Sequence, residues 1–565
     1  MSKRELEKVF ILSTTETLAV QADDGGLIIE PWSPMLIHCW TLCYLNEYTD
    51  NPHYRNPDVL QAIKQLGDFN QTSLDQEKGF TNDTCGWDEW RLFSWMEATE
   101  LLKEELNAEC LAVWGKSFIT AGDHVLSMCI DMETFDGGIP NHGIWNHAML
   151  YRIGQLYNRN DMQDMAAHAF ERIFQRQTED GCFREGGTFA GFPGSPVTMY
   201  NIVSIMAINM YYGFSQDPAA LDAMEKGWSW YYNFIFPDMS LPPALDARVH
   251  YVQGRSFIHP AYFSNKPEMR GVTEAFWKLR TGSERSKYLT GPSNCHGLGF
   301  LALQADKILD NVTPIEPSWP EYYKMTQGET CIRRRHNWHA VLCGISNAHA
   351  FTQTLPLWRL ERQSLVNVFH EKLGLIIGSA NSVVQEEISL FSFYEQGSAH
   401  YLHDNAYLKS TPPLDSLILQ YRGNTGTVSV DTNQEKACTI SLSIHGEMGK
   451  RTTPGPGHNI SAVAAKARLS LRLKTGDKII FKGKERILGE DGFILRIQPG
   501  EAVQCPGWTL SSSETPWTLR WPLYTNNPYA HLQPDEELAI AEAVLYSSAT
   551  STNAQPTVHF KIEIQ

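Results

Sequence analysis

Two short segments of the chain hold side chains that can transfer protons. Asn141 and His142 follow a Gly-Gly-Ile-Pro loop in DGGIPNHGIWNHAML, and Tyr200 lies at the start of the apolar run TMYNIVSIM. An imidazole accepts a proton near neutral pH and a phenol can donate one, so these residue types suit general acid–base catalysis. The simpler alternative is that Asn141 is a helix N-cap, His142 a satisfied polar neighbour and Tyr200 a buried aromatic.

A long loop rich in glycine and proline precedes Tyr200. It follows the phrase DGCFRE, which ends in Arg184 and Glu185, and it runs GGTFAGFPGSPV. Loops of this composition have hinge residues, so this one could cover a binding site. The alternative is an ordinary connector between two elements.

A third segment, residues 246–259, gathers cationic and aromatic side chains. Its sequence is DARVHYVQGRSFIH, and it includes Arg255 and His259. A guanidinium binds a carboxylate through two parallel hydrogen bonds, so Arg255 could neutralise an anionic ligand. The alternative is a solvated basic loop in an acidic protein.

Together, the three segments resemble motifs of the polysaccharide lyases. Asn-His-x-x-Trp, from Asn141 to Trp145, resembles the signature of the mannuronate-specific alginate lyases. D-G-x-F-x-E, a loop and then Tyr-Asn resemble the segment with their catalytic tyrosine, which here is Tyr200. D-x7-G-R-x-x-I, which contains Arg255, resembles the arginine motif of the chondroitin and hyaluronate lyases.

The spacing of the motifs is also similar to that of the chondroitin AC and hyaluronate lyases. Tyr200 follows Asn141 by 59 residues, and Arg255 follows Tyr200 by 55. The segment CIRRRHNWHAVLCGISN, with the basic run 333–335, resembles the strand that opens their β-domain. The resemblance implies a multidomain α and β protein, with an N-terminal α/α toroid in residues 1–325 and a C-terminal antiparallel β-sandwich in residues 326–565.

Three positions depart from the family pattern. Gly191 stands where the chondroitin and hyaluronate lyases have a histidine, and Pro193 stands where the alginate lyases have an arginine. His259 replaces a second arginine. The identity of the catalytic base therefore stays open between His142 and Tyr200.

The resemblance implies β-elimination in a uronic-acid-containing glycan, which leaves a 4,5-unsaturated uronate end. The proton on C5 is not acidic while the neighbouring carboxylate is charged, so Asn141 and Arg255 are the expected neutralising groups. Tyr200 is the expected acid for the leaving C4 oxygen, and it could also be the base if both groups lie on one face. The remaining expected substrate contacts are His259, Trp145, Arg184, Glu185 and Trp87.

Helices with the right periodicity surround these motifs. Residues 143–157 and 197–211 are apolar nearly all round, whereas 161–177 and 217–235 are amphipathic, the last beginning at Asp217-Pro218. An apolar helix is buried and an amphipathic helix lies at the surface, so the alternation predicts two concentric rings. In such a toroid the inner helices run parallel and their N-termini meet at one mouth.

After Pro320 the sequence changes to short β-rich stretches bounded by turns. Examples are HAVLCGISN, DSLILQYRG, ACTISLSIHG and DGFILRIQPG, which recur every ten to twenty residues or so. This pattern is typical of an antiparallel sandwich.

Composition excludes several classes of protein. The 565 residues carry a formal net charge of −17, which argues against a nucleic-acid binder. No apolar run reaches ~18 residues, so no membrane span is expected. The charged start MSKRELEKVF lacks a signal core and predicts a cytoplasmic protein, with a periplasmic or secreted one after signal removal as the alternative. The 11 cysteines have no CxxC spacing and predict free thiols.

No metal or cofactor is expected from the sequence. His142 and His147 are about 140° apart around a helix, and neither they nor the set His336, His339 and Cys343 has zinc-site spacing. A nucleotide-binding glycine loop is also missing. An anionic polysaccharide or oligosaccharide is therefore the expected partner, and the oligomeric state stays open.

Two other functions compete with the lyase hypothesis. A glycoside hydrolase on the same toroid would need paired carboxyl groups, for which Asp88, Glu89 and Glu185 are candidates. A non-catalytic glycan-binding protein would not depend on Tyr200. Only a lyase makes a conjugated double bond that absorbs ultraviolet light.

Overall fold

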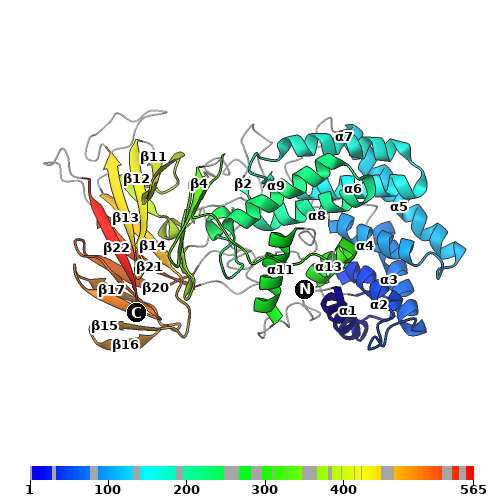
Figure 1. Ribbon diagram of the computed structural model, residues 1–565, viewed down its shortest axis with the longest axis horizontal. Helices are drawn as coiled ribbons and strands as arrows, with labels where there is room; N and C mark the ends of the chain where they lie inside the picture. Colours follow the sequence, from blue (N-terminus) through cyan, green and yellow to red (C-terminus); the bar gives the residue numbers. More distant parts are fainter. Residues whose placement is uncertain are drawn as a thin grey trace. The chain divides into compact units, whose positions relative to one another are not determined.

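The computed structural model describes most of the chain, and its elements are labelled in Figure 1. The described residues are 3–27, 33–76, 87–131, 140–185, 195–246, 266–281, 295–307, 311–326, 329–345, 365–378, 385–395, 398–412, 414–421, 423–446, 464–524, 537–545 and 555–565. The chain divides into two compact units. The first comprises Met1–Phe183, Tyr200–Trp230 and Phe257–Ser318, and the second comprises Arg184–Met199, Tyr231–Ser256 and Trp319–Gln565. The simple boundary between residues 325 and 326 stays a prediction.

The first half of the chain is helical, as the sequence predicts. Its α-helices are α1 (Lys3–Leu18), α2 (Leu36–Leu45), α3 (Pro57–Gln76), α4 (Trp87–Leu101), α5 (Ala108–Asp131), α6 (Pro140–Tyr157), α7 (Asn160–Arg176), α8 (Thr198–Ser215), α9 (Pro218–Phe234), α11 (Pro267–Thr281) and α13 (Cys295–Leu303). Among the described helices, none is long and apolar enough to span a membrane. Each cysteine in the described ranges is a free thiol, as expected.

Buried and amphipathic helices alternate along the chain. Every residue of α8 from Asn201 to Tyr211 is buried, whereas α7 buries only Met162, Ala166 and Phe170. Helix α9 begins at Pro218, and the backbone N–H of Ala219 donates to Asp217 Oδ1 at 2.9 Å. The predicted start of this helix is therefore confirmed, because a side-chain oxygen caps it and proline occupies its first position.

Helices α6 and α8 run parallel, side by side in Figure 1. Near their starts, the indole N–H of Trp145 donates to the carbonyl of Val203 at 2.9 Å. Further along, the rings of Tyr151 and Tyr211 meet edge to face at 5.1 Å. Both contacts pair residues about the same distance along each helix, which is possible only for parallel neighbours.

Helices α4 and α6 show the same relation. Glu89 contacts His142 near the two starts, and Glu97 pairs with Arg152 at 2.7 Å two turns later. Because α4, α6 and α8 share one direction, their first turns lie at the same end of the helical unit. The predicted gathering of inner-helix N-termini is thus observed for these three helices.

The second unit is built from antiparallel sheets. Its strands are β1 (Arg184–Glu185), β2 (Ser195–Pro196), β3 (Tyr322–Lys324), β4 (Thr330–Arg335), β5 (Trp338–Cys343), β6 (Val366–His370), β7 (Gly374–Ile377), β8 (Phe391–Glu395), β9 (Ser398–His400), β10 (Asn405–Thr411), β11 (Leu414–Tyr421), β12 (Asn424–Gln434), β13 (Ala437–Gly446), β14 (Ala464–Leu471), β15 (Lys478–Phe481), β16 (Lys484–Ile487), β17 (Phe493–Ile497), β18 (Ala502–Cys505), β19 (Trp508–Ser511), β20 (Trp517–Tyr524), β21 (Glu537–Leu545) and β22 (Thr557–Ile564).

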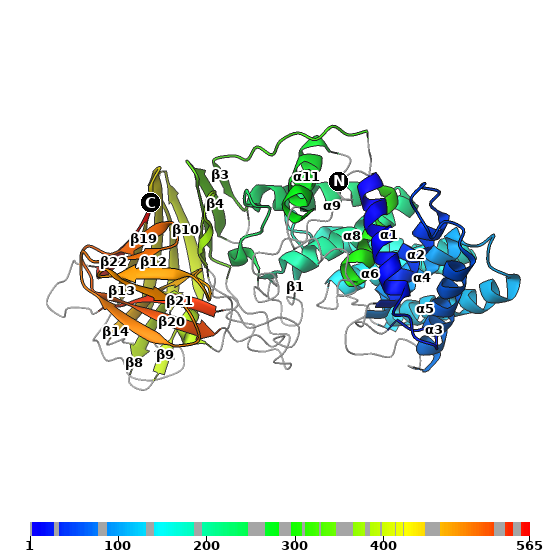
Figure 2. The same cartoon turned by 90° about the horizontal axis from the view of Figure 1, so that it is seen from below.

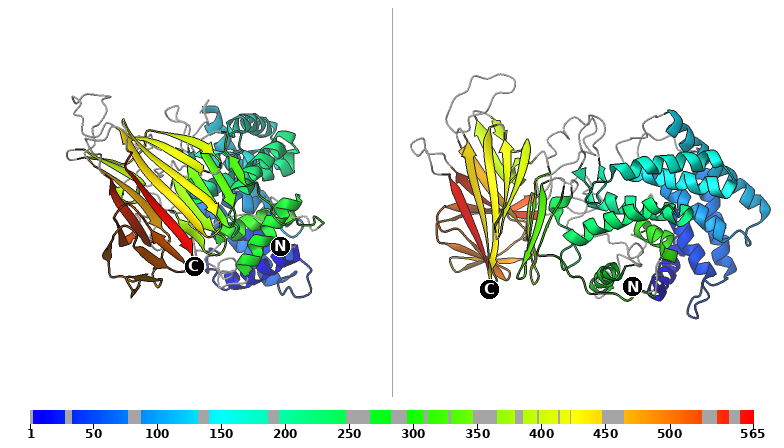
Figure 3. Two further views of the ribbon diagram at one scale, coloured as in Figure 1. Left: turned by 60° about the vertical axis from the view of Figure 1, so that its left-hand side comes forward. Right: turned by 45° about the horizontal axis from the view of Figure 1, so that its top comes forward.

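Two large sheets face each other in this unit, as Figures 2 and 3 show. One has the order β10-β11-β12-β13-β22-β19-β18-β15-β16, and the other has the order β17-β20-β21-β14-β7-β6-β5-β4-β3. Side chains from both sheets, such as Ile440 from β13 and Ala467 from β14, form one buried core. The β-rich stretches of the sequence correspond to these strands, although β3 precedes the basic strand β4 in the chain. The sandwich prediction is confirmed.

Candidate active site

The first turns of α4, α6 and α8, at one end of the helical unit, hold polar side chains from three distant parts of the sequence. They are Glu89 from α4, Asn141 and His142 from α6, and Tyr200 and Asn201 from α8. Helix N-termini carry partial positive charge and unpaired backbone N–H groups, so this end of the helices favours anionic groups.

A buried carboxylate holds the imidazole of His142. Glu89 Oε1 lies 2.5 Å from His142 Nδ1, and the exposed fractions of the two side chains are 1% and 17%. A carboxylate accepts hydrogen bonds, so the proton of the neutral imidazole belongs on Nδ1 and the lone pair on Nε2. Glu89 also stabilises the imidazolium that forms when Nε2 takes a proton. The pair therefore has the composition of an oriented general base.

Two aromatic side chains restrict the orientation of the His142 imidazole ring. The indole of Trp90 stacks on His142, with ring centroids 5.3 Å apart and an interplanar angle of 19°. Phe300 from α13 meets the edge of Trp90 at 5.2 Å. Trp90 and Phe300 are buried, so they limit the rotation of His142 while part of the imidazole stays open to solvent.

Asn141, which precedes His142 in α6, is buried, but it is not the helix cap. Helix α6 begins at Pro140, so Asn141 is its second residue. The N-cap interpretation is wrong because proline, with its fixed φ and missing N–H, takes the first helical position. The side chain of Asn141 is 1% exposed and has a polar partner.

Tyr200 is the third residue of α8 and is half-buried. Its carbonyl accepts a hydrogen bond from Ser204 Oγ at 2.8 Å, within the helix. The next residue, Asn201, is buried and accepts the backbone N–H of Phe183 at 2.8 Å. Asn201 thereby ties the start of α8 to the segment that leads into β1.

Trp145 was expected to contact substrate, and this expectation is wrong. Its side chain is 0% exposed, and its N–H is satisfied by Val203. Phe93 packs against it edge to face at 5.6 Å, and Phe300 lies 5.5 Å away. A ring enclosed on these sides belongs to the core and has no free face for a sugar.

His147 is separate from the candidate site. Its Nδ1 donates to the carbonyl of Gly143 at 2.6 Å, and Cys129 Sγ lies 3.3 Å from Nε2. Burial lowers the pKa of His147 to about 4 and raises the pKa of Cys129 to about 12, so both are neutral at pH 7. No group of three or more possible metal ligands occurs in the described ranges.

Several predicted site residues cannot be placed. Arg255 and His259 lie outside the described residues, as do the side chains of Trp87, Asp88 and Glu185. Arg184 is half-buried in β1, where it pairs with Pro196 of β2 across the loop that precedes Tyr200. Their roles in binding stay predictions.

In the described residues, the side chains of Arg333 and Arg334 in β4 make structural contacts. Arg333 Nε lies 2.5 Å from Asp415 Oδ2 and both side chains are buried. Arg334 donates to the carbonyls of Asn233 at 2.6 Å and Ile235 at 3.3 Å, at the end of α9. These arginines therefore join strands and cap a helix.

Sequence reasoning missed the partnership of Glu89 with His142. Glu89 was considered only as a hydrolase carboxylate, and 53 residues separate the two. No helix was predicted to begin near Glu89, so the sequence patterns held no positional link between it and His142. The register between α4 and α6 was needed to pair them.

Comparisons with known proteins identify the fold. No protein-family model matches the chain, and a search of curated proteins gave no match either. Among solved structures, the chondroitin AC lyase of Streptomyces coelicolor A3, in complex with chondroitin sulphate, has a TM-score of 0.56 and 11% identity, over 100% of this chain and 79% of that one. The fold is that of the α/α-toroid polysaccharide lyases.

Two further structures agree with this toroid-plus-sandwich fold. A mutant heparan sulfate lyase from Pedobacter heparinus has a TM-score of 0.51 and 10% identity, over 96% of this chain and 77% of that one. A heparinase III has a TM-score of 0.50 and 11% identity, over 100% of this chain and 84% of that one. The resemblance seen in the sequence motifs is thus confirmed as a resemblance of fold.

Proposed function

We propose that this protein is a lyase that cleaves a uronic-acid-containing glycan by β-elimination. The observation that carries the proposal is the Glu89–His142 pair at the mouth where α4, α6 and α8 begin. The pair supplies an oriented base beside an amide, Asn141, and at the same end as a phenol, Tyr200. These are the group types that elimination requires.

The first step makes the C5 proton acidic. Asn141 donates a hydrogen bond to the substrate carboxylate, and the N-terminus of α6 adds partial positive charge. Arg255 completes the neutralisation in this proposal. With its charge compensated, the carboxylate can accept the electron density that develops when C5 loses its proton.

The second step moves two protons and shifts two electron pairs. His142 Nε2 takes the C5 proton, and Glu89 stabilises the resulting imidazolium. The C5–H electrons form the C4–C5 double bond as the C4–O bond breaks. Tyr200 gives its hydroxyl proton to the leaving oxygen and is reprotonated from solvent. The Glu89 contact favours His142 over Tyr200 as the base.

The same contact weighs against the hydrolase alternative. A glycosidase acid and its partner carboxylate must both reach the scissile bond. Glu89 is 1% exposed and bound to an imidazole, so it is poorly suited to either role. The substrate class we propose is an anionic polysaccharide or oligosaccharide, and the substrate contacts are Arg184, Glu185, Trp87 and His259.

Ultraviolet absorbance of the product tests this function. The purified protein is incubated with alginate, glucuronan, hyaluronan, chondroitin and heparan-type polymers and oligomers, and the unsaturated product is followed. We expect activity on at least one of them, loss of activity in Tyr200→Phe, and no loss in Tyr212→Phe, a matched change in the same helix. Absence of absorbance on every glycan, or full activity of Tyr200→Phe, would contradict the proposal.

A further inference from the structure

Helix α8 begins at a residue whose polar groups are all bound by one distant segment. Asp246 Oδ2 accepts the backbone N–H of Thr198 at 2.9 Å and also accepts the Thr198 hydroxyl in a short hydrogen bond. The carbonyl of Thr198 accepts a hydrogen bond from the hydroxyl of Tyr231. The donors and the acceptor of Thr198 are thus fixed from residues 231–246.

Burial makes these contacts strong. Asp246, Thr198 and Tyr231 are each 1% exposed, so water does not compete for them. Val197, which precedes the helix, has no polar side chain with which to cap it. Asp246 therefore acts as the N-cap of α8 from outside the helix, and its charge complements the positive end of the helix dipole.

A sheet strand holds Asp246 in turn. The N–H of Asp246 donates to the carbonyl of Pro243 at 3.0 Å, and the N–H of Ala244 donates to Asn367 Oδ1 at 2.8 Å. Asn367 belongs to β6 and is 0% exposed. These links make Asp246 a fixed point rather than a mobile loop residue.

A ring contact anchors the earlier part of the same segment. Phe236 stacks on Phe369, also in β6, with centroids 4.6 Å apart and an interplanar angle of 12°. Phe236 is itself 0% exposed. The segment is therefore attached to one strand at two places on the way to Asp246.

We infer that Asp246 is a positioning residue for Tyr200, acting through Thr198. This inference rests on the proposed function, in which Tyr200 protonates the leaving oxygen. Tyr200 lies two residues after Thr198, within the same helical turn, so a shift of the first residue moves the phenol. A displacement of about 1 Å in an active site can cost about 100-fold in rate.

A purely structural cap predicts a different outcome. Loss of a structural cap lowers stability and lowers the rate on every substrate by the same factor. Loss of a positioning residue slows only the step in which Tyr200 acts. Substrates with an aryloxide at C4 separate the two cases, because a nitrophenolate leaves without needing a proton.

Steady-state kinetics of Asp246→Asn, with thermal unfolding as a parallel measurement, test the inference. On the natural glycan we expect kcat to fall about 100-fold with KM unchanged within about threefold. On a 4-O-nitrophenyl uronate we expect the rate to stay within about threefold of wild type, as for Tyr200→Phe. Thr198→Val should show a smaller loss of the same kind, and Thr198→Ser should be close to wild type.

Asp217→Ala provides the control. It removes the side-chain oxygen that caps α9 and should lower stability without any dependence on the leaving group. Equal losses of Asp246→Asn on both substrates, or no loss on the glycan, would overturn the inference. If the wild-type protein forms no unsaturated product at all, the proposed function fails instead, and the two failures are distinct.

Discussion

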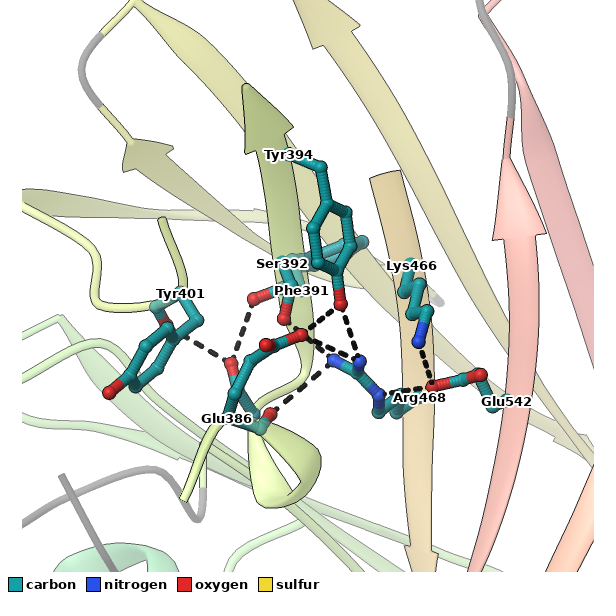
Figure 4. A network of polar contacts seen from close by, with 9 residues as sticks. Glu386, Phe391, Ser392, Tyr394, Tyr401, Lys466, Arg468 and Glu542 are labelled. Carbon is teal, nitrogen blue, oxygen red and sulfur yellow. Dashed lines mark hydrogen bonds and ion pairs between the residues drawn. The ribbon is translucent and has the colours of Figure 1, made fainter. Parts of the chain in front are cut away.

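Two buried clusters of this protein pair carboxylates with a nitrogen-bearing side chain, one among the helices and one on neighbouring strands of a single sheet. In the helical cluster, Glu89 binds the imidazole of His142. In the sheet cluster, shown in Figure 4, Arg468 is 2% exposed and pairs with Glu386 at 2.9 Å and Glu542 at 2.7 Å. The clusters share carboxylates and burial but differ in the side chain that the carboxylates bind.

The bound nitrogen-bearing side chain decides what chemistry each cluster can carry out. Besides the two carboxylates, the Arg468 guanidinium donates to Ser392 at 2.6 Å, to Tyr394 at 3.0 Å and to the Glu386 carbonyl at 3.4 Å, so all five of its N–H groups are used. It cannot lose a proton and has no donor left for a ligand. The imidazole of His142 has a second nitrogen, Nε2, that can accept a proton, and 17% of its side chain is exposed. A buried charged cluster is suited to catalysis only when it keeps a titratable atom within reach of a substrate.

The largest effect is expected at the helical cluster. His142→Ala removes the proposed base and should lower kcat about 10³- to 10⁴-fold. Exchange of the C5 proton with deuterated solvent separates the two proton-transfer roles. We expect His142→Ala to abolish exchange and Tyr200→Phe to keep it, because the acid acts on the leaving oxygen. The reverse pattern would make Tyr200 the base.

A stability effect without a catalytic one is expected at the sheet cluster. Arg468→Met leaves Glu386 without its cation and Glu542 with only Lys466, at 3.4 Å, and should destabilise the fold by about 3 kcal/mol. Urea unfolding measures this loss, and kcat at a permissive temperature should be unchanged. Arg496→Met, at an exposed position of β17, should have little effect on either quantity. A drop in kcat of folded Arg468→Met would contradict the conclusion that the sheet cluster is structural and the helical cluster catalytic.

Removal of the carboxylate alone should have an intermediate effect. Glu89→Gln keeps the shape of the side chain but no longer stabilises the imidazolium, so kcat should fall about 100-fold at neutral pH. Glu97→Gln is the control. Glu97 lies in the same helix as Glu89, α4, and its substitution removes the ion pair with Arg152 of α6. Activity of Glu89→Gln equal to that of wild type would remove the main support for His142 as an oriented base.

His147, the second histidine of α6, should make the stability of the protein depend on pH. Burial lowers the pKa of His147 in the folded protein to about 4, below the ordinary value near 6.5, so the unfolded chain binds more protons. The stability is therefore complete above pH 6.5 and falls as the pH drops toward 4. Between pH 6.5 and 5.5 the loss should be on the order of 1 kcal/mol. Thermal unfolding of His147→Gln should show a smaller drop than wild type over this range, and equal drops would contradict this role of His147.

Local sequence patterns predicted the elements and part of the site. The apolar runs at 143–157 and 197–211 correspond to α6 and α8, because full burial requires an apolar surface on all sides. The motif types and order pointed to Asn141, His142 and Tyr200, which the parallel helices bring to one end of the unit. These successes depend on short-range periodicity and on chemical type.

The rest depended on contacts that no local pattern contains. The pairing of Glu89 with His142 needs the register of two helices 53 residues apart. Trp145 was misassigned because tryptophan serves both cores and sugar-binding surfaces, and only burial distinguishes them. The contact between Thr198 and Asp246 likewise joins residues 48 positions apart.

Mass spectrometry of products formed in heavy-oxygen water tests the central claim most directly. Elimination breaks the C4–O bond without adding water, so the new non-reducing end should be an unsaturated uronate and neither product should contain heavy oxygen from bond cleavage. Hydrolysis adds one water and would introduce one heavy oxygen at the cleaved bond. Unlabelled, unsaturated products are the predicted result, and labelled, saturated products would contradict the assignment of this protein as a lyase.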